Sequence, residues 1–145
     1  GLNIGFIPTA SPGFNDAGVR TGHPAAPRYM TDDPNSTEGS LFKRMLNEVV
    51  VPRTDPKADH ILMVNSFNEW HEDTQIEPTV VAPRTNNDDS ANRTYSQGYY
   101  YEGYGNLYLN ILRGATAAVG DYNFDGSIDA AEIERIARKK ILLED

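Results

Sequence analysis

The sequence contains no cysteine. This absence excludes disulfide bonds, thiol catalysis and cysteine-ligated zinc, although it does not distinguish a cytoplasmic protein from a cysteine-poor secreted one. No apolar run approaches the roughly 18 residues that a membrane span needs, and no basic leader precedes an apolar core. Lys and Arg number 13 against 21 Asp and Glu, which gives a formal net charge of -8. Because this charge repels phosphate backbones, we expect no nucleic-acid partner.

The remaining composition is that of a folded protein. Hydrophobic residues make up 39% and charged residues 23% of the 145 positions, close to globular averages. The sequence begins Gly-Leu-Asn-Ile without Met, which we interpret as a strand entered partway through a longer protein. We expect two parts: residues 1–119, a fragment of a larger domain, and residues 120–145, a separate small module.

Apolar periodicity predicts the elements of the first part. Leu2–Thr9 is an apolar run typical of a strand, followed by a loop rich in Pro and Gly. Ser36 or Thr37 is a candidate cap for a helix that Pro52 ends, with apolar residues recurring at helical spacing from Leu41 to Val50. His60–Phe67 is nearly all apolar without alternation, which predicts a parallel strand covered on both faces.

The order of these elements predicts an α/β protein. A final helix carries Leu107, Tyr108, Ile111, Leu112 and Ala115 at helical spacing. Residues 78–104 between the second strand and this helix are polar and too long for an ordinary connection, so we expect them to be functional or mobile. Strand, helix, strand, helix is the order of a parallel sheet. Two such units leave sheet edges unpaired, so we expect the chain to fold poorly alone.

Polar and acidic residues follow the second predicted strand, in the segment Asn65–Pro78. In parallel α/β folds, the chemistry lies at this end of the strands. Glu69 and Glu72 are three residues apart, and a turn after Glu69 lets their carboxyl groups converge. A retaining glycosidase needs about 5–5.5 Å between its carboxyl groups and an inverting one about 6.5–9.5 Å, which spacing in sequence alone does not decide. Alternatively, both acids are solvated and Trp70 fills the core.

The segment Ser66-Phe-Asn-Glu-Trp-His-Glu-Asp-Thr-Gln-Ile-Glu-Pro78 resembles the signature of glycoside hydrolase family 99, the endo-α-mannosidases. Ser11-Pro-Gly-Phe-Asn-Asp16, with Arg20, resembles a second loop of that family. Together they span about the last third of such a catalytic barrel. The family usually has Gly after the second Glu, where this chain has Asp73. The resemblance implies a (β/α)₈ TIM barrel and a retaining endo-acting hydrolase of α-mannosidic linkages in mannan- or N-glycan-type chains.

The resemblance also implies residue roles. Glu69 would take the proton from the substrate 2-hydroxyl, which attacks C1 to give a 1,2-anhydro sugar, while Glu72 would protonate the leaving oxygen and then activate water. No cofactor takes part in this catalysis. Glycan-binding candidates are Asn68, Trp70, His71, Gln75, Asp16 and Arg20. For Asn68, His71 and Gln75 the alternative is tethering of loop backbone, and for Asp16 and Arg20 it is an internal ion pair.

The segment 121–132 fits the twelve-residue EF-hand loop. Hard oxygen ligands at this spacing suit Ca²⁺, and Gly126 permits the sharp turn. The predicted ligands are Asp121, Asn123, Asp125, Ser127, Asp129 and Glu132. Ile128, Ile133 and later apolar residues are the expected anchors. EF-hands usually pair, so a second EF-hand or a dockerin-type partner is possible. A weak calcium site suits a secreted, periplasmic or cell-surface protein.

Three functions remain open at this point. The first is the endo-α-mannosidase. The second is a related barrel protein of polysaccharide assembly, which carries a similar carboxylate pattern, although Ser66-Phe-Asn and Thr74-Gln-Ile favour the hydrolase. The third is a non-catalytic calcium-binding or adhesion module in which Glu69 and Glu72 are incidental.

Overall fold

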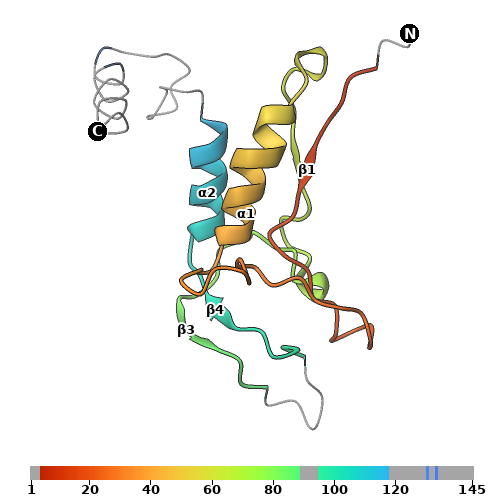
Figure 1. Cartoon of the computed structure of the whole chain (residues 1–145), viewed down its shortest axis with the longest axis vertical. Helices are drawn as coiled ribbons and strands as arrows, with labels where there is room; N and C mark the ends of the chain where they lie inside the picture. Colours follow the sequence, from red (N-terminus) through yellow and green to blue (C-terminus); the bar gives the residue numbers. More distant parts are fainter. Residues whose placement is uncertain (1–3, 89–94, 118–129, 131–132, 134–145) are drawn as a thin grey trace. The chain divides into compact units, whose positions relative to one another are not determined.

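The computed structural model in Figure 1 describes residues 4–88, 95–117, 130 and 133. The chain divides into two compact units, Gly1–Ala115 and Thr116–Asp145. The first unit contains all the strands described below and nearly all of the helices. In the second unit Ala130 and Ile133 are helical. Within the described residues, no helix combines the length and the apolar character needed to cross a membrane.

Two short strands form the parallel pairing that the sequence predicts. β1 (Thr9–Ala10) lies beside β2 (Met63–Val64), with Ala10 opposite Val64. The amide of Asn65 donates to the carbonyl of Ala10 at 2.9 Å and continues the ladder to the ends of both strands. Parallel strands deliver their carboxyl ends to the same edge. The segments that follow β1 and β2 therefore start side by side.

The strands are shorter and more open than predicted. Residues 4–8 lie outside β1, and Ile4, Phe6 and Ile7 are exposed. Met63 in β2 exposes 57% of its surface, so the prediction of a strand covered on both faces is wrong. An apolar run indicates that both faces of a strand are suited to burial, but it does not show that both faces are covered in this structure. Among the described residues, the core lies on one side of this pair only.

The first predicted helix is present, but its ends differ from the prediction. It starts as α1 (Ser40–Arg44) and continues through the π-helical turn η1 (Met45–Val50) and the 3-10 turn η2 (Val51–Arg53). The cap is Gly39 at φ 78°, without a side-chain hydrogen bond. Ser36 instead accepts from the amide of Met30 at 2.7 Å. Pro52 lies in η2 rather than ending the helix, because proline fits the first turn of a new helical segment.

The core lies between this helix and α2 (Leu107–Thr116), the final helix that the sequence predicts (Figure 1). Phe42 and Tyr108 pack with ring centroids 5.6 Å apart, and Tyr104 meets Tyr108 edge to face at 4.7 Å. The fully buried apolar residues are Ala10, Phe42, Leu46, Val50, Ile76 and Tyr108. Ile76 comes from the carboxylate motif, so the core directly anchors the segment that carries the candidate catalytic residues.

Residues 78–104 contain a hairpin that the sequence analysis missed. β3 (Ala82–Thr85) pairs antiparallel with β4 (Tyr101–Gly103) (Figure 1). A Cβ at Gly103 would lie 2.0 Å from the carbonyl oxygen of Val80, so only glycine fits there. The guanidinium of Arg84 lies over the rings of Tyr29 and Tyr100 at 4.8 and 4.6 Å. These contacts join the hairpin to the first long loop.

Candidate active site

The carboxylate motif folds into a tight turn directly after β2. A short 3-10 turn, η3 (Pro56–Ala58), precedes β2, and the motif itself forms the 3-10 turn η4 (Trp70–Glu72). Glu69 caps η4 by accepting from the amide of His71 at 3.2 Å. The hydroxyl of Ser66 accepts from the amide of Glu69 at 2.9 Å and contacts the hydroxyl of Thr74 at the same distance. The chain therefore turns at Glu69, as convergence of the two carboxyl groups requires.

Asp73 ends this turn in a left-handed conformation. Its φ is 52° and its ψ 31°, a region that glycine adopts freely and that Asn and Asp tolerate better than most residues. Its Oδ1 accepts from Arg28 Nη1 at 3.0 Å and from Gln75 Nε2 at 3.2 Å. The backbone conformation thus explains why glycine suits this position. The side chain of Asp73 is used to fix the turn to the protein beneath it.

Glu69 and Glu72 are both accessible, but they have different neighbours. The side chain of Glu69 is 47% exposed and has His71 Nδ1 at 3.5 Å from its Oε1. The side chain of Glu72 is 30% exposed, and its Oε1 accepts from Arg20 Nη1 at 3.2 Å. The backbone carbonyl of Glu72 accepts from the amide of Asn15 at 2.8 Å. Glu72 is therefore bound to the loop that follows β1, through its backbone and its side chain.

Asp16 lies behind Arg20 and is 1% exposed. Its Oδ2 accepts from Arg20 Nη1 at 3.0 Å and lies 2.9 Å from His23 Nδ1. Burial of Asp16 raises the pKa of its carboxyl, but the hydrogen bonds from Arg20 and His23 outweigh that effect and hold the pKa below its usual value. Asp16 is therefore a buried charged group. The ion pair considered as an alternative for Asp16 and Arg20 is present.

Arg28 is 2% exposed and holds the turn through hydrogen bonds to Asp73 and Gln75. Nε donates to Glu38 and to the Tyr108 hydroxyl, both at 2.9 Å, and Nη2 donates to the Gln75 carbonyl at 2.7 Å. Its guanidinium also lies 4.2 Å from the ring centroid of Tyr108. Burial of the guanidinium lowers the pKa of Arg28, but the acidic groups around it raise that pKa by a larger amount. Arg28 therefore stays charged. Burial raises the pKa of the Glu38 carboxyl.

The predicted glycan-binding residues of the turn divide into exposed and buried ones. Trp70 is 49% exposed, so it does not fill the core, and its Nε1 donates to Glu77 Oε2 at 2.9 Å. Asn68 and His71 are exposed as well. Gln75 is only 5% exposed, and its Nε2 donates to the side chain of Asp73 at 3.2 Å rather than to the loop backbone. The exposed residues remain candidates for sugar contacts.

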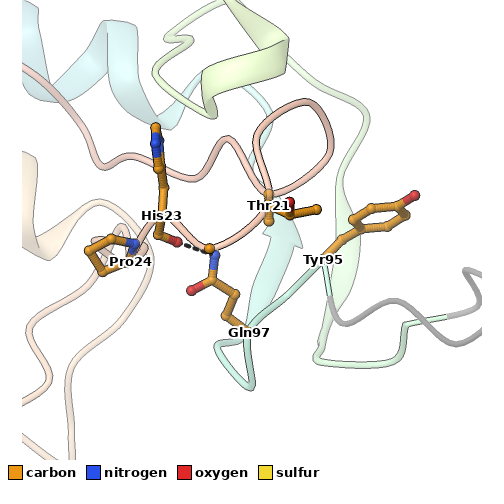
Figure 2. A pocket seen from close by; sticks show the side chains of 7 residues that line it. Thr21, His23, Pro24, Tyr95 and Gln97 are labelled. Atoms are coloured by element: carbon orange, nitrogen blue, oxygen red, sulfur yellow. Dashed lines mark hydrogen bonds between the residues drawn. The ribbon is translucent and has the colours of Figure 1, made fainter.

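A cavity of about 470 Å³ lies on the loop that carries Arg20 (Figure 2). The residues that line it include Thr21, His23, Pro24, Tyr95 and Gln97. Gln97 Nε2 donates to the carbonyl of His23 at 3.0 Å, and its Oε1 accepts from the amide of Ala25 at 3.2 Å. The side chain of Gln97 therefore fixes the backbone of the loop at His23 and Ala25. Cavities of 300–1,000 Å³ with mixed polar and apolar walls are usual for small ligands.

The sequence analysis missed His23, Gln97 and Arg28. Each is an isolated polar residue in a loop, and its partners lie far away in the sequence, so no local pattern marks it. The predicted calcium ligands at 121–129 and 132 lie outside the described residues. Ile133, one of the expected apolar anchors, is exposed, so the structure does not show its predicted anchoring contact. Among the described residues, no group of three or more His, Asp or Glu side chains is arranged to hold a metal ion.

Comparison with known proteins gives consistent matches. A glycoprotein endo-alpha-1,2-mannosidase of Xenopus laevis is 35% identical over 54% of this chain and 15% of its own length. A glycoprotein endo-alpha-1,2-mannosidase-like protein of Mus musculus is 32% identical over 77% of this chain and 20% of its own length. The chain thus spans a fifth or less of these relatives. A solved GH99 endo-alpha-mannosidase from Bacteroides thetaiotaomicron matches with 20% identity and a TM-score of 0.45, over 97% of this chain and 32% of the solved chain.

The sequence model for glycosyl hydrolase family 99 matches residues 2–110. This range includes both candidate carboxylates and the loop with Asp16, Arg20 and His23. It covers most of the first compact unit. The chain therefore belongs to glycosyl hydrolase family 99, a family of glycoside hydrolases.

Proposed function

We propose that the complete protein carrying this chain is a retaining endo-acting glycoside hydrolase that cleaves α-mannosidic linkages in mannan- or N-glycan-type chains. One observation carries the proposal: a chain of family 99 presents Glu69 and Glu72, both solvent-accessible, on one turn at the carboxyl end of a parallel strand. The names of the frog and mouse relatives support the substrate class. The two βα units are proposed to belong to a (β/α)₈ barrel, whose active sites lie at this end of the strands.

The first chemical step uses the substrate's own 2-hydroxyl. The carboxylate of Glu69 takes the proton of that hydroxyl while its oxygen attacks C1 and forms the 1,2-anhydro sugar. The bond from C1 to the leaving oxygen breaks, and Glu72 gives that oxygen its proton. Substrate-assisted routes of this kind depart from the usual glycosyl-enzyme ester.

The second step returns both carboxyl groups to their starting states. Glu72, now a carboxylate, takes a proton from water, and the water oxygen attacks C1. The C1–O2 bond of the anhydro sugar opens, and O2 takes the proton held by Glu69. Each step inverts C1, so the configuration is retained overall. The two groups must start in opposite protonation states, which requires different surroundings. The two carboxyl groups do have different neighbours, because His71 lies beside Glu69 and Arg20 lies beside Glu72.

Two substitutions in the complete protein test the proposal. Glu69→Gln and Glu72→Gln keep side-chain shape but remove acid-base function, so each is expected to lower kcat by several orders of magnitude. Glu72→Gln is expected to recover much of its loss on a substrate with an acidic leaving group, which needs no protonation. Glu48→Gln, an exposed carboxyl on the first helix, is the control. Near-normal turnover in both site variants, or inversion at C1 in the first product seen by NMR, contradicts the proposal.

A calcium-binding role is proposed for the segment 121–132. Carboxylate and carbonyl oxygens at EF-hand spacing suit Ca²⁺, and Glu132 would supply two carboxylate oxygens. The proposed mechanism routes no step through the ion, so its role is structural. A weak calcium site of this kind suits a protein secreted, periplasmic or held at the cell surface, and we propose that location on this ground alone.

A further inference from the structure

We propose that Asp16 is a positioning residue for Glu72 that acts through Arg20, by fixing the guanidinium and by balancing its charge while Glu72 alternates between acid and base. The proposal rests on the proposed function of Glu72. It assigns Asp16 no contact with the glycan. His23 Nδ1 lies 2.9 Å from the same carboxyl oxygen of Asp16 that accepts from Arg20.

Geometry is the first support. A single nitrogen, Arg20 Nη1, lies 3.0 Å from Asp16 Oδ2 and 3.2 Å from Glu72 Oε1. Arg20 is half exposed, whereas Asp16 is buried, so the buried carboxylate fixes the position of the exposed guanidinium. The backbone holds the same relationship: the amide of Arg20 donates to the Asp16 carbonyl at 2.8 Å, and the amide of Asn15 donates to the Glu72 carbonyl at 2.8 Å.

Charge is the second support. An isolated arginine next to a carboxyl group favours the carboxylate and opposes the protonated form that an acid catalyst needs. Asp16 places a negative charge against the same guanidinium nitrogen that contacts Glu72. The pair therefore presents a small net charge to Glu72 while keeping a hydrogen-bond donor on it. The other charged or titratable groups of the surrounding loops are Glu69, His71, Asp73, Arg28 and His23.

Asp16 keeps its negative charge although it is buried. Its Oδ1 has no hydrogen-bond partner in the described part of the chain, and a buried carboxylate with an unpaired oxygen is costly. The hydrogen bonds that Arg20 and His23 make to Oδ2 outweigh this cost and hold the pKa of Asp16 below its usual value. A full negative charge therefore lies against the guanidinium that contacts Glu72.

The test measures pH profiles of kcat/KM for the complete protein and its Asp16→Asn variant. With the charge removed, Arg20 acts on Glu72 uncompensated, so protonated Glu72 is lost at lower pH. The alkaline limb of the profile is expected to move down by about one pH unit. On a substrate whose leaving group needs protonation, this shift is expected to lower kcat at pH 7 by up to about tenfold, with KM changed less than about twofold. An activated substrate with an acidic leaving group should lose much less.

A double-mutant cycle shows whether the effect passes through Arg20. In an Arg20→Gln background the guanidinium that links Asp16 to Glu72 is absent, so adding Asp16→Asn is expected to leave the pH profile where it was. Glu48→Gln is the matched control, because it removes another ion pair at the same i, i+4 spacing, with Arg44 on an exposed helix face. It is expected to change neither the profile nor kcat. Thermal unfolding of each variant checks that the fold is kept.

Several outcomes overturn the proposal. An unshifted profile, an equal loss on both substrates, or the same shift in the Arg20→Gln background each assigns Asp16 a structural role only. Should Asp16→Asn not fold, Arg20→Gln alone decides: it is expected to move the alkaline limb and to change the ratio of activities on the two substrates. Normal activity of Glu72→Gln instead refutes the proposed function itself, whatever Asp16 does.

Discussion

Arg28 and Asp73 form an ion pair at 3.0 Å on the inner side of the turn that carries Glu69 and Glu72. Arg28 comes from the first long loop and Asp73 from the end of the turn, so the pair joins two loops that follow neighbouring parallel strands. Arg28 also donates to the carbonyl of Asp73 at 3.1 Å. The position of the candidate catalytic turn therefore depends on a buried cation.

Replacement of that cation is expected to be strongly destabilising. Arg28→Met keeps an apolar stem but leaves Glu38 and Asp73 buried without their partner. Removal of one member of a buried ion pair costs about 3–5 kcal/mol in comparable cases. Urea unfolding of the complete protein measures the change.

Arg44→Met is the control for this measurement, because Arg44 pairs with Glu48 at 3.1 Å on an exposed surface. Such exposed pairs contribute about 0–1 kcal/mol. Equal destabilisation by the two variants would show that Arg28 does not organise the turn.

The left-handed backbone of Asp73 predicts an ordering of three variants. Asp73→Gly and Asp73→Ala both remove the ion pair with Arg28, but only alanine must adopt φ 52° with a Cβ. Asp73→Gly is expected to be more stable than Asp73→Ala by about 1 kcal/mol. Asp73→Asn is expected to exceed Asp73→Ala as well, because asparagine tolerates this conformation. Thermal unfolding ranks them, and an alanine variant as stable as the glycine variant contradicts the assigned conformation.

Asp55 predicts a pH dependence of stability. Its carboxylate accepts from the amides of Lys57 at 2.8 Å and Phe6 at 3.1 Å, and these bonds lower the pKa of Asp55. A group with a lowered folded-state pKa stabilises the fold above its unfolded value, about 3.9, and loses that contribution as the pH falls through the folded value. The Tm difference between the natural protein and Asp55→Ala is therefore expected to be constant above about pH 5 and to shrink below about pH 4. A Tm difference between the two proteins that stays constant from about pH 3 to about pH 7 contradicts this prediction.

Trp70 is expected to bind sugar with an orientation set by Glu77. Trp70→Ala should weaken glycan binding about tenfold, which corresponds to about 1.4 kcal/mol, whereas Trp70→Phe, which keeps an aromatic face, should lose less. Glu77→Gln keeps a carbonyl oxygen as acceptor for the indole N–H and is expected to resemble the natural protein. Isothermal titration with a glycan on the Glu72→Gln protein measures binding without turnover. Equal affinity of the alanine variant removes Trp70 from the site.

Calcium is expected to stabilise the complete protein without entering the reaction. At a free Ca²⁺ concentration about 100 times the Kd, the linkage contribution is about 2.7 kcal/mol. Chelation should therefore lower the Tm while the rate at moderate temperature stays within about twofold. Glu132→Gln should remove the calcium response. An immediate loss of turnover on chelation, with the fold intact, would place the ion in the chemistry.

Sequence patterns predicted those elements whose apolar periodicity is strong. The final helix followed from the helical spacing of residues such as Leu107 and Ile111, and the parallel pairing followed from the non-alternating apolar run around Val64 and from the order of the elements. The β3–β4 hairpin was missed because its strands are short, contain Pro83 and Arg84, and lie on either side of a long connection. The cap at Gly39 was missed because a left-handed glycine start uses no side-chain signal, whereas Ser36 offered a conventional one.

The candidate site was predictable only where its residues are contiguous. Glu69 and Glu72 were found because the motif places both on one segment. The contact of Arg20 with Glu72, the burial of Asp16 and the support from Arg28 depend on the meeting of two loops. Such meetings are set by the parallel register of the two strands rather than by local sequence. His23 gave no signal, because its significance comes entirely from the carboxylate beside it.

The joining of the two loops by Asn15 and Arg20 also limits how this protein can change during evolution. Glu72 receives one hydrogen bond from the backbone of Asn15 and one from the side chain of Arg20. An insertion or deletion in the segment between those donors would displace the carboxylate together with the loop. New substrate preferences are therefore expected to arise by single replacements at positions that line the cavity, such as Thr21 and Tyr95, while the length of this loop stays constant among active descendants.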